Sequence, residues 1–315
     1  MENAVPAGIL ARIGDTPLVE LARLPDPGGA RILVKLESVN PTGSMKDRMA
    51  LAMIRAAERD GRLRPGGRVV EYTGGSTGVS LAMVCAARGY GLDIVTSDAF
   101  SAEKLAHMAA LGARLTIVPS VAGRMDAKLT RDMIAAARDI ARATGAFWTD
   151  QLNNQDQIAA YRAMADEVFE QTGGTVDAIV QSTGTEACVR GLAEGLRARK
   201  PGIRVVAVEP AESAVLSGGP SGAHKIEGVG AGFVVPLWRP DIADRIAPVS
   251  TEAAMAMARR LAREEALFAG TSTGANLVAA LALAREMGRG ATVVTVMCDS
   301  GIKYLSTPLY RDVAA

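Results

Sequence analysis

The chain of 315 residues is poor in the residue types that many functional classes require. Its three cysteines, Cys85, Cys188 and Cys298, are far apart and include no CxxC pair. This spacing predicts neither a zinc site nor a disulfide framework, and it fits a reducing cytoplasm. With only two histidines, His107 and His224, a mechanism that needs a histidine cluster is excluded. We therefore expect a protein without a metal site.

Charge of one sign and long apolar runs are also missing. The chain carries 35 basic and 34 acidic residues, for a formal net charge of +1, and aromatic residues make up 4%. Balanced charge gives no field that attracts nucleic acid or a membrane surface, and few aromatic rings leave no platform for base stacking. No apolar run approaches the roughly 18 residues that span a bilayer, and MENAVPAGIL lacks the features of a secretory signal. We expect a cytoplasmic protein with neither nucleic acid nor membrane among its partners.

Short runs of β-branched residues alternate with longer helical patterns along the chain. The predicted strands are RVVEY (68–72), LDIVT (92–96), ARLTIV (113–118), VDAIV (176–180), IRVVAVEP (203–210) and ATVVTVM (291–297). Helical patterns such as 79–88 and 101–111 lie between them. This alternation predicts an α/β fold with parallel sheets that helices cover on both faces, as in doubly wound folds. The length predicts two lobes, and the polar segment 149–157 places their boundary nearby.

Three loops rich in glycine, serine and threonine precede predicted helices. They are TGGSTG (73–78), STGTEA (182–187) and GTSTG (270–274), which follows the short apolar run ALFA and is expected to be a strand-to-helix turn. In parallel sheets ligands bind at the carboxyl ends of the strands. Consecutive N–H groups at a helix start favour negative charge. We expect these loops to hold a ligand, or a pair of ligands, with more than one anionic group.

Two of these loops also match the G-x-S-x-G pattern of a hydrolase nucleophile, at Ser76 and Ser272. An α/β-hydrolase orders its triad as serine, then a carboxylate, then histidine, and no histidine follows Ser272. Ser76 could use only His107, which lies in a helical pattern and is expected on its surface, or His224. A serine hydrolase is therefore a remote alternative.

Lys46 lies in the stretch ESVNPTGSMKDR, at the predicted start of a helix that closes at Gly61. A lysine at a helix N-terminus opposes the helix dipole, which favours the neutral amine. A neutral amine is the form that reacts with an aldehyde.

The segment NPTGSMKDR resembles the lysine motif of the pyridoxal-phosphate-dependent cysteine synthase and cystathionine β-synthase family (O-acetylserine sulfhydrylase-like, fold type II). The resemblance extends over nearly the whole chain, through IGDTPLVEL (13–21), EYTGGSTGVSLA (71–82), STGTEACVRG (182–191), HKIEGVGAGF (224–233), GTSTGAN (270–276) and DSGIKYLST (299–307). It implies two doubly wound lobes with parallel sheets, similar to the tryptophan synthase β fold. The smaller N-terminal lobe would be 1–145, with 13–34 crossing to the larger lobe, and the larger C-terminal lobe would be 146–315. It also implies a homodimer.

The resemblance implies β-replacement on an activated L-serine such as O-acetylserine, through an α-aminoacrylate intermediate, with sulfide as the nucleophile. The cofactor would be pyridoxal 5′-phosphate, which Lys46 would bind covalently before it removes the substrate α-proton. The phosphate would be held by Gly184, Thr185, Ala187 and Cys188, the pyridine nitrogen would face Ser272, and Ser76 would contact the cofactor ring. The amino-acid substrate would be held by Thr73, Gly74, Gly75, Ser76, Thr77, Gln151 and Gly228.

The chain departs from the sulfhydrylase pattern at several of these positions. Gly74 replaces a serine and Ser76 an asparagine, and we expect the glycine to widen the space beside the substrate. Glu186 stands next to the phosphate loop, where it is unfavourable unless it points away, and Arg190 could pair with it along the helix. Cys298-Asp299 replaces Pro-Ser, and cystathionine β-synthases resemble this chain in having the aspartate.

These departures keep the reaction open within the class. The alternatives are another β-replacement (from O-phosphoserine, or in cystathionine or diaminopropionate-type synthesis), β-elimination as a desulfhydrase or dehydratase, and a cofactor-binding protein without catalysis.

Overall fold

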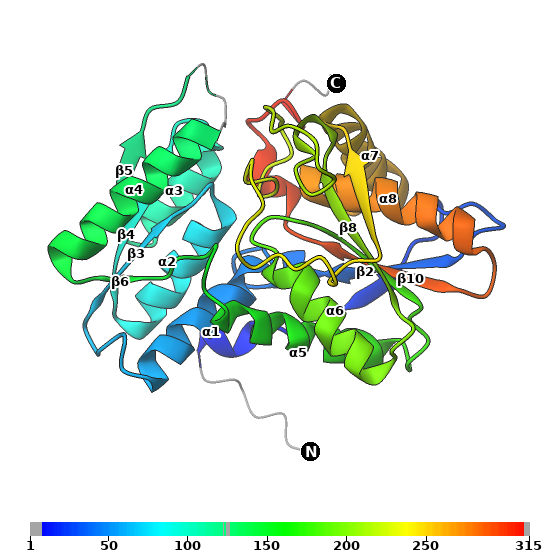
Figure 1. The fold of residues 1–315 in the computed structure, drawn as a ribbon, viewed down its shortest axis with the longest axis horizontal. Helices are drawn as coiled ribbons and strands as arrows, with labels where there is room; N and C mark the ends of the chain where they lie inside the picture. Colours follow the sequence, from blue (N-terminus) through cyan, green and yellow to red (C-terminus); the bar gives the residue numbers. More distant parts are fainter. Residues whose placement is uncertain (1–7, 122, 124–126, 312–315) are drawn as a thin grey trace.

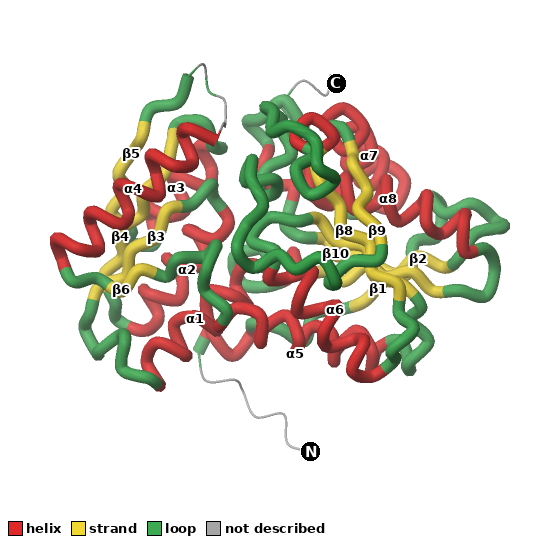
Figure 2. The backbone as a smooth tube through the Cα atoms, in the orientation of Figure 1, coloured by secondary structure: helices red, strands yellow, loops and turns green. Residues whose placement is uncertain are grey.

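The computed structural model describes residues 8–121, 123 and 127–311, which form two β-sheets that lie side by side (Figures 1 and 2). The smaller sheet has four parallel strands in the order β5-β4-β3-β6. Its strands are β3 (Arg68–Tyr72), β4 (Gly91–Ser97), β5 (Arg114–Val118) and β6 (Phe147–Trp148). Strand β6 begins just past residue 145, where the smaller lobe was predicted to end, and the division into lobes remains a prediction.

The larger sheet has six strands in the order β1-β2-β10-β7-β8-β9, and all neighbours are parallel except the antiparallel pair of β1 and β2. Its strands are β1 (Leu18–Glu20), β2 (Arg31–Leu36), β7 (Ala178–Ser182), β8 (Arg204–Pro210), β9 (Arg245–Val249) and β10 (Thr292–Met297). The chain therefore starts in the larger sheet, builds the smaller one, and then returns.

Helices cover the sheets on both faces. They are α1 (Lys46–Arg59), α2 (Ser76–Arg88), α3 (Ala102–Ala110), α4 (Ala127–Thr144), α5 (Asp156–Gln171), α6 (Ala187–Arg199), α7 (Thr251–Glu265) and α8 (Thr271–Met287), with short 3-10 turns η1 (Ile9–Arg12), η2 (Glu37–Val39), η3 (Ala211–Ser213) and η4 (Gly301–Tyr304). One apolar core joins α1, α2, α5 and α6, whereas α4 packs on the smaller sheet and α7 and α8 on the larger. The predicted α/β fold with parallel sheets is confirmed.

One predicted turn is wrong. The loop before Ser272 was expected to follow a strand, but the run ALFA (266–269) is not one. Helix α7 ends at Glu265, Ala266 has a positive φ of 57°, and only Ala269 forms an isolated bridge, with Ser300. Four apolar residues are too few to distinguish a strand from a helix-to-helix connection.

Helix α1 is fixed to its surroundings by buried charges just after Lys46. Arg48, at 5% side-chain exposure, lies 2.8 Å from the fully buried Glu37 and 2.6 Å from Glu167, and Lys35 also contacts Glu167. Burial opposes ionisation of Glu167, but hydrogen bonds and charge from Arg48 and Lys35 lower its pKa to about 2. The network joins α1 to β2 and α5, so the first turn of α1 is held from two sides.

Replacing Arg48→Met should destabilise the protein by about 3–5 kcal/mol, because Glu37 would be left buried without its partner. The matched control is Arg62→Met, which breaks ion pairs at 41% side-chain exposure and should cost at most about 1 kcal/mol. Urea unfolding measures both. Equal losses in the two variants would contradict this account of the network.

Candidate active site

A cavity of about 1210 Å³ lies between the two sheets and is lined by residues from both. Lys46, the first residue of α1, faces it. The other predicted site residues that line it are Thr73, Gly74, Gly75, Ser76, Thr77, Gln151, Gly184, Thr185, Cys188, Gly228 and Ser272. Ala187 is buried at the first position of α6 and does not line the cavity. The fold therefore collects loops that are far apart in the sequence, and the roles predicted for their residues remain predictions.

Several helices start at this cavity without a side-chain cap, namely α1, α2, α3, α6 and α8. Helices α2, α6 and α8 follow Gly75, Glu186 and Gly270, and none of these residues makes a capping hydrogen bond. The first N–H groups of a helix have no acceptor within it. Ser250, in contrast, caps α7. Several uncapped helix starts at one cavity suit a ligand with several anionic groups.

The loop before α6 is shaped for close approach of an anion to its backbone. A Cβ at Gly184 would lie 2.6 Å from the carbonyl oxygen of Gly228, so only glycine fits there. Gly230 N–H donates to Thr183 O at 3.0 Å, which holds the two glycine loops together. With Lys46 in the same cavity, these residues fit a cofactor that carries a phosphate and an aldehyde.

Glu186 is buried in this loop at 5% exposure, with a positive φ of 68°. The expected pairing with Arg190 is wrong: Arg190 contacts Glu194 at 2.8 Å, because Glu186 precedes the helix in a left-handed conformation. Within the described residues, its Oε2 has no hydrogen-bond partner. Burial, and then the charge of Glu209, raises the pKa of Glu186 well above its usual value. A raised pKa favours the neutral acid, which lessens the negative charge beside a phosphate.

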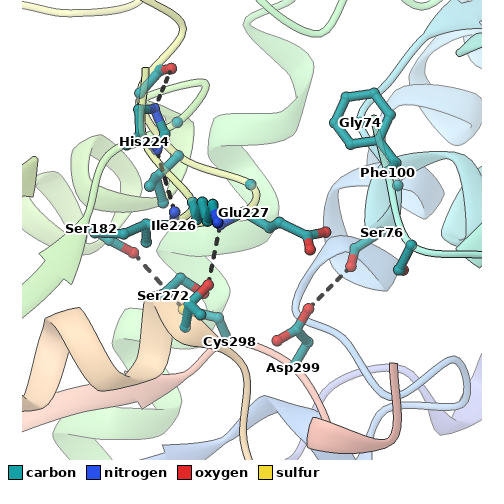
Figure 3. Close-up of a pocket in the computed structure, with 18 of the residues that line it drawn as sticks. Gly74, Ser76, Phe100, Ser182, His224, Ile226, Glu227, Ser272, Cys298 and Asp299 are labelled. Carbon is teal, nitrogen blue, oxygen red and sulfur yellow. Dashed lines mark hydrogen bonds between the residues drawn. The ribbon is translucent and has the colours of Figure 1, made fainter. Parts of the chain in front are cut away.

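In the loop of residues 73–77, Ser76 and Gly74 each face a side chain from another segment of the chain. Ser76 Oγ donates to Asp299 Oδ2 at 3.1 Å (Figure 3). Tyr304 OH donates to the same oxygen at 2.7 Å. Gly74 faces the ring of Phe100: a Cβ at Gly74 would lie 2.5 Å from Cε1 of that ring. The expectation that Gly74 widens the substrate space is therefore wrong, because the aromatic ring fills it.

Neither histidine pairs with Ser76. His107 is exposed on α3, as expected. The ring of His224 is used within its own loop, where Nδ1 accepts from Ile226 N–H and Nε2 lies 3.3 Å from Gly230 O. The hydrolase alternative has no support in this geometry.

Two hydrogen bonds hold Gln151 in place. Its backbone N–H donates to Glu71 Oε2 at 3.0 Å, and its side-chain amide donates to Tyr72 O at 2.7 Å. Burial outweighs the donors around Glu71 and raises its pKa to about 8.

Ser272 is the second residue of α8 and is buried at 5% exposure. Asn276, one turn on, bonds to Gln181 Oε1 and Val296 O, which ties this helix to β7 and β10.

The fold and the cavity define an enzyme class in which a lysine at a helix start and anion-binding loops receive a phosphorylated aldehyde cofactor. The family model of pyridoxal-phosphate dependent enzymes matches residues 9–299, and the chain belongs to this family. It is therefore an enzyme that depends on pyridoxal phosphate.

Individual relatives agree with this assignment. The chain is 41% identical to a cysteine synthase of Staphylococcus aureus over 300 residues, which cover 95% of both chains. The solved O-acetylserine sulfhydrylase isoform 3 of Entamoeba histolytica is 39% identical, with a TM-score of 0.92 over 100% of this chain and 94% of that one. A solved O-ureido-L-serine synthase is 35% identical, with a TM-score of 0.92 over 98% and 95% of the two chains.

Sequence reasoning missed several residues that line the cavity, above all Phe100, Lys104, Glu227 and Tyr304. Phe100 and Lys104 follow β4, so the rule that ligands lie beyond the carboxyl ends of parallel strands could have indicated them. Glu227 lies in a quoted motif, but nothing local distinguished it from its neighbours.

Glu186→Gln should weaken the pH dependence of stability. A folded-state pKa above the usual value near 4.5 stabilises the protein fully below that value, and this contribution is lost as pH rises through the folded-state pKa. The wild-type apoprotein should therefore lose more stability than the variant between pH 5 and 9, by at most about 1.4 kcal/mol per pH unit. Urea unfolding across this range, with the exposed Glu252→Gln as control, measures the difference. If stability changes with pH equally in wild type and Glu186→Gln, the raised pKa of Glu186 is contradicted.

Gly74→Ser should destabilise the protein by about 1–3 kcal/mol, because the new side chain overlaps Phe100. Adding Phe100→Ala should relieve part of this cost, so the double variant should be more stable than the two single effects predict. Gly28→Ser, with nothing within 4 Å of the new Cβ, is the matched control. Strict additivity in urea unfolding would show that Phe100 does not occupy this space.

Proposed function

We propose that the protein replaces the acetoxy group of O-acetyl-L-serine with sulfide, as its cysteine synthase relatives are named to do. The main support for this proposal is that one cavity contains Lys46 together with the starts of α2, α6 and α8. We also propose a cytoplasmic homodimer, in keeping with the family resemblance. Within the described residues, no helix has the length and apolarity needed to cross a bilayer.

Each loop has a distinct task in this proposal. Residues 184–188 would hold the cofactor phosphate with backbone N–H groups, and Ser272 would offer a hydroxyl to the pyridine nitrogen. A hydroxyl, unlike a carboxylate, does not keep that nitrogen protonated, which favours loss of the β-substituent. The loop 73–77 and Gln151 hold the substrate carboxylate at the start of α2.

In this proposal Lys46 is the base that transfers the proton. When bound, the cofactor supplies an electron sink that makes the substrate α-proton acidic. The Lys46 amine would take this proton, and acetate would leave from the β-carbon. Sulfide then adds at the same carbon, and the proton returns from Lys46 to the α-carbon. The network around Arg48 keeps the lysine in reach throughout.

The test is turnover of O-acetyl-L-serine and sulfide by the holoenzyme, followed as cysteine formed and acetate released. Equal amounts of both products support β-replacement. Acetate and pyruvate without cysteine would instead show β-elimination, and no change in the cofactor spectrum on adding O-acetyl-L-serine would contradict the proposal.

A nucleophile larger than sulfide is the second candidate. The cavity of about 1210 Å³ must also hold the cofactor, but it extends to Arg259 and Thr307, beyond the loops assigned to cofactor and carboxylate. The carboxylate of Asp299 also faces this cavity, and its Oδ1 has no partner among the described residues. A relative named O-ureido-L-serine synthase shares the fold. Comparing kcat/KM for sulfide with that for an amino-acid thiol separates the candidates.

Lys46→Ala should lower kcat/KM by about a thousandfold or more, because the covalent anchor and the base are lost together. Borohydride reduction followed by peptide mass spectrometry should find the cofactor on Lys46 in the wild type. Lys128→Ala, at an exposed lysine of α4, should change neither result. A cofactor adduct on another lysine would overturn the assignment.

A further inference from the structure

The first turn of α3 reaches across the cavity from the smaller sheet to the loops of the larger one. Lys104 Nζ lies 2.7 Å from an Oε2 of Glu227, in the glycine-rich loop that contains Gly228. Its neighbour Glu103 accepts hydrogen bonds from the N–H and the hydroxyl of Ser306, at 2.8 and 2.7 Å. Two consecutive side chains thus link the two walls of the cavity.

The Lys104 ion pair is largely shielded from water. The side chain of Lys104 is 3% exposed and that of Glu227 is 21% exposed. The ammonium also lies 4.2 Å from the centre of the Tyr304 ring. A buried ammonium is tolerated only with opposite charge or comparable compensation nearby, and the carboxylate and the ring supply it. Such a pair holds its geometry better than an exposed one does.

The stem of Lys104 packs against the backbone of the loop 73–77. A Cβ at Gly75 would lie 2.4 Å from Cδ of Lys104, so no free space separates the stem from the loop. Tyr304, under the ammonium, bonds to Asp299, which in turn holds Ser76. Figure 3 shows Glu227 reaching from the opposite loop toward the side of Ser76 and Phe100. Two routes therefore connect the loop to the larger sheet.

We infer that Lys104 is a positioning residue of the loop 73–77, and that its ion pair with Glu227 holds this loop in the geometry that binds an amino-acid carboxylate. The inference rests on the proposed function, which assigns that carboxylate to the loop. The stem prevents Gly75 from moving outward, and Glu227 keeps the stem in place. Sulfide has no carboxylate, so its use does not depend on this pair.

The test compares Lys104→Met, which keeps the stem but removes the charge, with Glu227→Gln, which removes the opposite charge. In each holoenzyme the KM for O-acetyl-L-serine should rise about tenfold, with kcat within about threefold of wild type and the KM for sulfide unchanged. Lys104→Arg keeps the charge and should lie closer to wild type. Lys128→Met, the same substitution at an exposed lysine, should have no effect.

A second readout does not need turnover. The affinity for L-alanine, measured from the spectrum of the bound cofactor, should fall about tenfold in each single variant. The double variant should be no weaker than the weaker single, because the two residues act as a unit. If the wild type binds L-alanine but does not turn over, the proposed function fails while this inference is still tested.

Wild-type affinity and KM in both single variants would overturn the inference. So would a loss spread equally over both substrates and cofactor content, which would mean that Lys104 supports the cavity as a whole. If Lys104→Met does not fold, Glu227→Gln, which keeps the shape of the side chain, carries the test with the same expected outcomes.

Discussion

The uncapped helix starts that face one cavity, among them those of α2, α6 and α8, are the constraint on which the site depends. The N–H groups at the starts of α2, α6 and α8 have no acceptor inside their helices and no side-chain cap. Parallel strands bring the turns before α2 and α6 to the cavity. Helix α8 arrives by another route, through the bridge between Ala269 and Ser300. The free N–H groups at these helix starts favour ligands that bring negative charge into the cavity.

The reactive lysine depends on a different kind of support. Lys46 is the first residue of α1, and two residues later Arg48 is tied to Glu37 and Glu167 inside the protein. Buried ion pairs contribute little net stability, but they tolerate few alternative geometries because a displaced charge is costly. The network therefore orients the start of α1 more than it stabilises the fold. A lysine at a helix start would otherwise be free to swing into solvent.

The residues that depart from the sulfhydrylase pattern have environments that accommodate them. Gly74 leaves a space that the ring of Phe100 fills, and Ser76 is bonded to Asp299. Burial raises the pKa of Glu186, which favours its neutral form and lessens the negative charge beside this loop. The loop sequences alone suggest a wider pocket and looser contacts than the structure has.

The sequence by itself determined the alternation of strands and helices, the lysine and the three glycine-rich loops. These features depend on consecutive residues, whose backbone preferences and chemistry act locally. The run ALFA marks the limit, because four residues carry too little periodicity to define a strand. Only the tertiary structure decided that Ser76 meets Asp299 and that Lys104 meets Glu227, across separations of 223 and 123 residues. Such contacts arise from the packing of two sheets around one cavity, and no local pattern specifies which distant side chains that packing brings together.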